Sequence, residues 1–176
     1  LPLLGSKEGI MHISMAFLNA GDQVLVPNPG YPTYTSVTRL LEAEPVFYNL
    51  DEKNHWQPKL DQLKSLDCTK ICLMWINSPH MPTGTSIDSQ LLRDLIAWAA
   101  QNEILLVNDN PYSFVLTDYP KSIFQNQIDK SNIMELNSLS KSFNMAGWRI
   151  GMLSGSKDNI NHVLKVKSNM DSGMFY

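Results

Sequence analysis

The amino-acid sequence predicts an α/β fold of three layers (α/β/α), in which helices cover both faces of a mostly parallel central sheet. Strand-like and helix-like segments alternate along the chain, as such a sheet requires. The segment KICLMWI, residues 70–76, is a continuous apolar run typical of a central strand buried on both faces. Because no repeat, low-complexity stretch or linker divides the 176 residues, one domain over residues 1–176 is expected.

The individual elements follow from apolar periodicity and from the residues that begin and end helices. A first helix is expected to begin at Gly5-Ser6-Lys7 and to end at NAGD, residues 19–22. Strand-length apolar runs predict strands at residues 23–27, 45–50, 70–76, 104–109, 132–139 and 149–155. Further helices are expected at about 33–43, around 91–99 and over 157–167. Thr85 and Asp88 resemble a capping box before the helix around residues 91–99.

Composition and charge exclude several classes of protein. Hydrophobic residues make up 43% of the chain and the formal net charge is −3, as in an ordinary soluble globular protein without a nucleic-acid-binding patch or a membrane span. The four histidines share no metal-ligand spacing, so no metal is expected. Cys68 and Cys72 are expected to be reduced, mostly buried thiols of a cytoplasmic protein. The chain begins at Leu1 without a signal segment, so we expect a piece of a longer protein.

Polar residues follow three of the predicted strands. They lie at residues 77–84, at 109–112 and at 138–141. Ligands of mostly parallel sheets bind beyond the carboxyl ends of the strands, so these three segments predict a single site.

Some of these residues could bind an anion. Gly5, Ser6 and Lys7 lie at an expected helix N-terminus, where free backbone N–H groups attract anions, although a plain helix cap explains Gly5-Ser6 alone better. The hydroxyl groups and the guanidinium that could join them belong to Ser138, Ser140 and Arg149.

Two other residues could carry covalent chemistry and charge stabilisation. Lys141 would serve Schiff-base chemistry if burial and neighbouring cations favoured its neutral form, whereas an isolated lysine is by default a solvated surface residue. Asp109 ends a predicted strand, where a solvated turn or a helix cap is the usual explanation. A buried aspartate would instead need a cationic partner such as a protonated pyridine nitrogen.

The chain resembles the large, cofactor-binding domain of the fold type I aminotransferases, which use pyridoxal 5′-phosphate (PLP). The resemblance is to the class I/II branch that includes the aspartate, alanine and LL-diaminopimelate aminotransferases. It rests on six segments in the family's order: GSKEGI (5–10), NPGYPTY (28–34), NSPHMPTGT (77–85), NDNPY (108–112), NSLSKSFNMAGWRIG (137–151) and DSGMF (171–175). Their joint order and spacing is far more specific than any one of them.

The resemblance implies a role for each candidate residue. Lys141 would form an aldimine with the cofactor and move the proton of the substrate Cα. Asp109 would keep the pyridine nitrogen protonated, so that the ring accepts electrons. Tyr112 would donate a hydrogen bond to the phenolic oxygen O3′, and Tyr31 would stack on the ring. The phosphate would be held by Gly5, Ser6, Lys7, Ser138, Ser140 and Arg149.

One position departs from the family's pattern. Met81 stands where the family usually has an asparagine that donates to O3′, and a methionine cannot donate. His80 is near enough to substitute, and Asn77 lies four residues upstream. The preferred interpretation is that Tyr112 alone suffices.

The resemblance also implies parts that this chain does not reach. The family's substrate-carboxylate arginine lies in a C-terminal small domain, and an N-terminal arm helps to secure the dimer. The longer protein is expected to be a homodimer, with DSGMF near the partner's cofactor, and the isolated piece to transaminate poorly. The substrates of the longer protein would be an amino acid and a 2-oxo acid, and the residues of this chain do not identify either one.

Two other functions remain compatible with these residues. A PLP-dependent carbon–sulfur β-lyase shares the first steps of the reaction, and nothing in these residues separates it from an aminotransferase. A PLP-sensing domain of a transcription regulator would bind the cofactor without turnover, but Asp109, Tyr112, Lys141 and Arg149 form a complete catalytic set. A nucleotide-binding domain is disfavoured because no glycine-rich fingerprint follows the first strand.

Overall fold

The computed structural model describes residues 1–125 and 129–173 and confirms the predicted fold class. Its strands are β1 (Pro2–Leu3), β2 (Gln23–Asn28), β3 (Glu44–Asn49), β4 (Ile71–Asn77), β5 (Leu105–Asp109), β6 (Ile133–Ser138) and β7 (Gly151–Gly155). They form one seven-stranded sheet in the order β1-β7-β6-β5-β4-β2-β3. The strands from β3 to β6 pair in parallel, whereas β7 pairs antiparallel with both β6 and β1.

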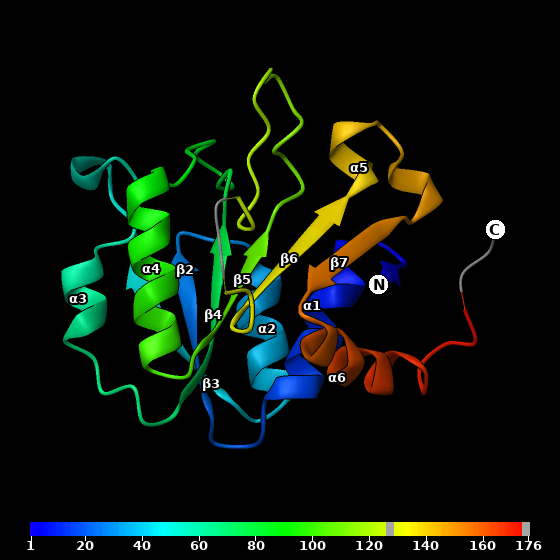
Figure 1. Cartoon of the computed structure of the whole chain (residues 1–176), viewed down its shortest axis with the longest axis horizontal. Coiled ribbons are helices and arrows are strands. Elements are labelled where there is room, and N and C mark those ends of the chain that lie inside the picture. Colours follow the sequence, from blue (N-terminus) through cyan, green and yellow to red (C-terminus); the bar gives the residue numbers. More distant parts are fainter. Residues whose placement is uncertain (126–128, 174–176) are drawn as a thin grey trace.

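Helices cover both faces of this sheet (Figure 1). They are α1 (Ser6–Phe17), α2 (Pro32–Leu40), α3 (Leu60–Lys64), α4 (Ser89–Gln101), α5 (Leu139–Ser142) and α6 (Lys157–Lys167). On one face α1 packs against α2 and α6, and on the other face α3 packs against α4. The short helix α5 continues from the end of β6.

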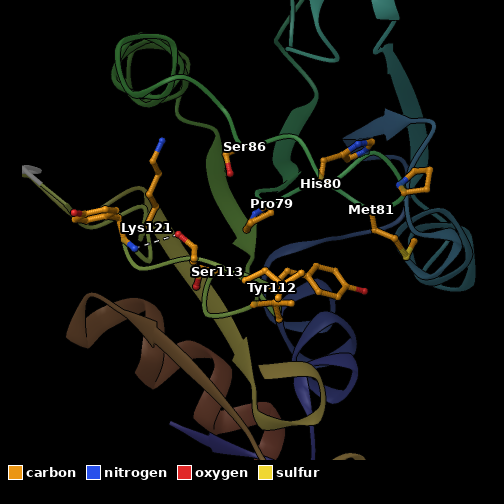
Figure 2. A pocket seen from close by; sticks show the side chains of 13 residues that line it. Pro79, His80, Met81, Ser86, Tyr112, Ser113 and Lys121 are labelled. Carbon is orange, nitrogen blue, oxygen red and sulfur yellow. Dashed lines mark hydrogen bonds between the residues drawn. The ribbon is translucent and has the colours of Figure 1, made fainter. Parts of the chain in front are cut away.

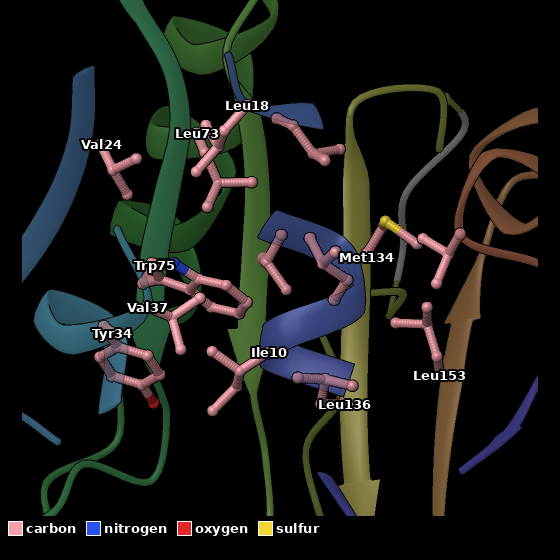
Figure 3. Close-up of a cluster of buried hydrophobic side chains, with 14 of the residues drawn as sticks. Ile10, Leu18, Val24, Tyr34, Val37, Leu73, Trp75, Met134, Leu136 and Leu153 are labelled. Atoms are coloured by element: carbon pink, nitrogen blue, oxygen red, sulfur yellow. The ribbon is translucent and has the colours of Figure 1, made fainter. Parts of the chain in front are cut away.

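The central strand β4 is buried on both of its sides. Leu73 and Trp75 point into an apolar cluster that includes α1 and α2, whereas Met74 and Ile76 point into a second cluster that includes α4. This division follows from the alternation of side chains along a strand. Figure 3 shows the first cluster, which also contains Tyr34 of α2. The apolar run at residues 70–76 is therefore a central strand, as the sequence predicts.

The start of α4 corrects the predicted capping box. Asp88 is the N-cap residue, and its carboxylate accepts hydrogen bonds from the backbone N–H groups of Gln90 at 2.8 Å and Leu91 at 3.3 Å. Thr85 does not cap the helix, because its carbonyl oxygen instead closes a turn with the N–H of His80 at 2.8 Å. The helix α2 also ends at Leu40, before the predicted end near residue 43.

Other sequence expectations have mixed outcomes. The prediction of a helix over residues 157–167 is confirmed, because α6 has these bounds. Among the described α-helices and β-strands, three were not predicted: β1, α3 and α5, with two, five and four residues, are too short to show a period. Cys68 and Cys72 are free thiols but are only partly buried, because both lie near the amino-terminal end of β4. Across residues 1–125 and 129–173, no helix combines the length and the apolar character of a membrane span.

The strand order places a crevice at one edge of the sheet. From β2 the chain passes through α2 to β3 on one side of β2, and it later returns to the other side of β2 to form β4. The helix that follows β2 lies on one face of the sheet, and the helix that follows β4 lies on the other face. The loops that follow β2 and β4 therefore separate at this edge. In doubly wound sheets such a switch point is where ligands bind.

Candidate active site

A hollow of about 280 Å³ lies beyond the carboxyl ends of β2, β4, β5 and β6. Nine of the predicted site residues line it: Ser6, Lys7, Tyr31, Asp109, Tyr112, Ser138, Ser140, Lys141 and Arg149. Five further residues also line it: Tyr34, Asn77, Met81, Pro111 and Ala146. The structure thus brings the segments that follow the predicted strands together around one hollow.

The predicted anion site lies where β7 passes under the N-terminus of α1. Gly5 precedes this helix with a φ of 88°, and a Cβ built on it would lie 2.4 Å from Nη2 of Arg149. A Cβ on Gly151 would lie 2.7 Å from the backbone nitrogen of Ser6. Glycine at both positions is therefore needed for the arginine and the strand to approach the helix N-terminus this closely.

Arg149 is held beside this N-terminus by neutral oxygen atoms. Its Nη1 donates to the carbonyl oxygen of Ala146 at 2.9 Å and lies 3.5 Å from Oγ of Ser140, and its Nη2 donates to the carbonyl oxygen of Leu4 at 3.4 Å. Among the residues that the structure describes, neither Arg149 nor Lys7 forms a salt bridge. Two uncompensated cations beside free N–H groups fit a phosphate group.

Lys141 lies on α5, directly after β6. Ser138 is the N-cap of this short helix, and its Oγ accepts a hydrogen bond from the N–H of Ser140 at 3.2 Å. No hydrogen bond or ion pair engages the Lys141 ammonium group within the described part of the chain, although the side chain lines the hollow. Its amine is therefore available for reaction with a bound molecule.

Asp109 is buried at the floor of the hollow, with 5% of its surface exposed. Its Oδ2 accepts a hydrogen bond from the hydroxyl of Tyr34 at 2.8 Å, whereas its buried Oδ1 has no partner among the described residues. Burial raises the pKa of this carboxyl group to about 6, and the hydrogen bond from Tyr34 opposes that rise. A cationic N–H group in the hollow would satisfy the free oxygen, and a protonated pyridine ring fits this requirement.

Two tyrosines frame the space above Asp109. Tyr112 is half-buried, and its pKa is raised chiefly by burial and then by the charge of Asp109. Tyr31 precedes α2, and its ring meets the ring of Tyr34 edge-on, with centroids 5.7 Å apart. Both side chains line the hollow.

The residues near Met81 that could replace a missing donor are engaged elsewhere. Nε2 of His80 lies 3.0 Å from the carbonyl oxygen of Pro29, so it carries the hydrogen, and Nδ1 accepts from the hydroxyl of Thr83 at 2.8 Å. Nδ2 of Asn77 donates to the carbonyl oxygen of Asp109, and its Oδ1 accepts from the N–H of Met81, both at 2.7 Å. His80 and Asn77 therefore hold the loops of the site together.

A second hollow of about 550 Å³ adjoins the first (Figure 2). Met81 and Tyr112 line both hollows, so they form the wall between them. Ser86 and Lys121 also line the second hollow. The first hollow therefore has a further space beside it.

Sequence reasoning did not assign Tyr34 to the site. A signal was present, because Tyr34 follows Tyr31 by three residues and positions three apart share one face of a helix. What the sequence could not show is the hydrogen bond to Asp109, which lies 75 residues away. The DSGMF segment was also predicted to serve a site, but Met174 and Phe175 lie outside the described residues.

A lysine, an aspartate and two cations that suit a phosphate group line one hollow. Together they define a site of the pyridoxal-phosphate type. Residues 1–172 match the family described as aminotransferase class I and II. The chain belongs to this family.

Individual relatives agree with this assignment. The chain is 40% identical to the LL-diaminopimelate aminotransferase of Aquifex aeolicus, and the match covers 99% of this chain and 46% of the relative. The apo structure of BacF from Bacillus subtilis superposes with a TM-score of 0.94 at 34% identity, covering 99% of this chain and 44% of that one. An aminotransferase from Staphylococcus aureus gives a TM-score of 0.91 at 31% identity, with 99% and 46% covered. The chain thus spans about half the length of the proteins it matches.

Proposed function

We propose that this chain is the cofactor-binding part of a PLP-dependent aminotransferase, which transfers an amino group from an amino acid to a 2-oxo acid. The observation that carries the proposal is the hollow itself. Three features line this one space and support the proposal: Asp109, whose buried Oδ1 has no partner among the described residues, the Lys141 side chain, and the cations beside α1. Membership of the class I and II aminotransferases supports the same conclusion.

Each residue has a task that its surroundings suit. When bound, PLP supplies an aromatic ring that accepts electrons from a carbanion beside it. Asp109 would hold the proton on the ring nitrogen, Tyr112 would donate to the phenolic oxygen, and Tyr31 would pack on the ring face. Lys141 would attach the cofactor and then move a proton at the substrate Cα.

The residues around the N-terminus of α1 would hold the phosphate group of the cofactor. Gly5, Ser6 and Lys7 offer N–H groups, a hydroxyl and an ammonium, and Arg149 offers a guanidinium without a carboxylate partner. Ser138 and Ser140 would complete this set from the side of β6.

Three wider features are part of the proposal. LL-diaminopimelate, named in the relatives, is the first amino donor to assay. A homodimer is proposed from the resemblance to the family, whose sites lie at the dimer interface. A cytoplasmic location is proposed because both cysteines are free thiols.

Borohydride reduction tests the cofactor and the lysine together. After incubation with PLP, reduction and peptide mapping, we expect one phosphopyridoxyl group on Lys141 and none in Lys141→Ala. Lys121 lines the adjoining hollow and provides a matched control, because Lys121→Ala should keep the label on Lys141. Labelling scattered over surface lysines, or labelling that survives in Lys141→Ala, would refute the proposal.

The substitution Gly151→Ala, which adds a methyl group next to the N-terminus of α1, should weaken phosphate binding. In Gly151→Ala the new Cβ would lie 2.7 Å from the backbone nitrogen of Ser6, so this donor must move. Loss of one hydrogen bond to a charged group corresponds to roughly tenfold or more in affinity. We expect that loss in a calorimetric titration with PLP. Gly147→Ala is the control, because a Cβ there meets nothing within 4 Å. Equal affinities in the two variants would contradict the assignment.

A further inference from the structure

The hydroxyl group of Tyr34 is the contact that orients the Asp109 side chain. The donor and Oδ2 are 2.8 Å apart in a buried environment, and Oδ1 has no partner within residues 1–125 and 129–173. A phenol has one hydrogen to donate, so it occupies one carboxylate oxygen and leaves the other free. We propose that Tyr34 is a positioning residue, which turns Oδ1 of Asp109 towards the hollow and favours the ionised form of this carboxyl group.

Tyr34 can act in this way because its ring is immobilised. It has no exposed surface, and it stacks on the ring of Trp75 with centroids 5.1 Å apart and planes 9° apart. The backbone of Tyr34 lies in α2, where its carbonyl oxygen accepts a hydrogen bond from the hydroxyl of Thr38 at 2.8 Å. In Figure 3 the ring lies within the apolar cluster, and its hydroxyl group is at the end nearer the carboxyl edge of the sheet.

Asp109 needs such a partner because its surroundings oppose ionisation. Burial raises its pKa, and the hydrogen bond from Tyr34 lowers it again. Burial and the charge of Asp109 hold the pKa of Tyr34 well above its ordinary value, so the phenol remains a donor. The proton therefore stays on Tyr34, and the negative charge stays on Asp109.

Other charged or titratable groups face the same space and must be separated from the effect of Tyr34. They are Lys7, Tyr31, Tyr112, Lys141 and Arg149. The substitution Tyr34→Phe removes one hydroxyl group and leaves all of these groups in place. Any change in the titration of Asp109 can then be assigned to the lost hydrogen bond.

Tyr48 offers a matched control. It is also a buried tyrosine, and its hydroxyl donates at 2.8 Å to the carbonyl oxygen of Trp75 instead of to a carboxylate. Tyr48→Phe makes the same chemical change in the second apolar cluster, the one that includes α4. It removes a buried hydrogen bond without touching Asp109.

The decisive measurement is the titration of Asp109 in the cofactor-free chain, followed by carbon-13 NMR of labelled aspartate carboxyl groups. The Asp109 signal is identified by its loss in Asp109→Asn. In Tyr34→Phe we expect the midpoint to rise by about one pH unit, because the hydrogen bond favours the charged form. In Tyr48→Phe the midpoint should stay at its wild-type value. An unchanged midpoint in Tyr34→Phe, or equal shifts in both variants, would overturn the proposal.

A second measurement keeps the test valid if Tyr34→Phe does not fold. The charge of Asp109 also acts on Tyr112, so this measurement uses Tyr112→Phe protein labelled at tyrosine Cζ. One resonance should shift at the Asp109 midpoint and lose that shift when Asp109→Asn is added. If no tyrosine resonance of this variant follows Asp109, the hydrogen bond does not couple Tyr34 to Asp109 and the inference is wrong.

The consequence for the cofactor rests on the proposed function. At pH 8 we expect Tyr34→Phe to bind PLP up to about tenfold more weakly than Tyr48→Phe. If wild-type protein binds no PLP, the proposed function fails while the titration result stands. If wild type binds PLP and both variants bind it equally well, the effect of Tyr34 on the cofactor is refuted.

Discussion

Asp109→Asn is expected to stabilise the cofactor-free chain at pH 8 while it weakens cofactor binding. The folded state holds this carboxyl group with a pKa raised from 3.8 to about 6. A difference of this size corresponds to about 3 kcal/mol between the two protonation states. Asparagine has almost the same shape and carries no charge, so it avoids the cost of burying a carboxylate.

The dependence on pH follows from which state binds the proton more tightly. Because the folded pKa is the higher one, the folded state binds more protons than the unfolded state between about pH 4 and 6. This group therefore makes the wild type lose stability as the pH rises through that range. Asp109→Asn removes this loss. The free energy of unfolding of the variant should therefore equal that of the wild type near pH 4 and exceed it by up to about 3 kcal/mol at pH 8.

The same substitution should have the opposite effect on the cofactor. The amide nitrogen or oxygen of asparagine cannot replace the charge of Oδ1 opposite a protonated ring nitrogen. Breaking a buried charge pair by removing one partner costs roughly 3–5 kcal/mol, or more than 100-fold in affinity. Weaker PLP binding together with greater stability of the cofactor-free chain would show that the ionised Asp109 favours cofactor binding and destabilises the cofactor-free fold.

Urea unfolding at several pH values, with and without PLP, measures both effects. Asp118→Asn serves as the control, because Asp118 is exposed and lies outside the hollow. Since both proteins contain the other titrating groups, the difference between variant and wild type isolates Asp109. A stability difference that does not change between pH 4 and pH 8 would contradict the raised pKa.

The parts of the fold that the sequence could predict are those with long, regular patterns. The helix at 157–167 and the apolar run at 70–76 each have enough residues to show their period or their burial. The two-residue strand β1 has no pattern of its own and exists because β7 pairs with it. Thr85 and Asp88 both resemble caps in the sequence, and only the path of the turn through His80 decides between them.

The candidate site divides in a similar way. Lys141 and Asp109 could be proposed because polar residues after buried strands meet at one edge of a parallel sheet. Tyr34 could not be assigned, because its role depends on a contact with a residue far along the chain and on a ring held by Trp75. The engagement of both His80 nitrogens depends likewise on the distant carbonyl oxygen of Pro29. Local patterns thus predict which residues reach the site, and tertiary packing decides how their polar atoms are used.

Trp75→Ala should have the largest effect on stability of any single substitution considered for this chain. Trp75 has no exposed surface, lies in the central strand β4 and stacks on Tyr34. Truncating a buried tryptophan to alanine costs about 3–5 kcal/mol, which is a large fraction of the roughly 5–15 kcal/mol that stabilises a domain. We expect the urea midpoint, followed by far-UV circular dichroism, to fall accordingly.

Two further variants separate packing from other effects of the indole ring. Trp148 is 71% exposed, so Trp148→Ala should change stability by no more than about 0.5 kcal/mol. Nε1 of Trp75 is buried without a hydrogen-bond partner within the described residues, so Trp75→Phe loses volume but also removes an unsatisfied donor. It should therefore cost less than Trp75→Ala and still support the ring of Tyr34. If Trp75→Ala were as stable as Trp148→Ala, the stacked pair could not be what holds the Tyr34 hydroxyl against Asp109.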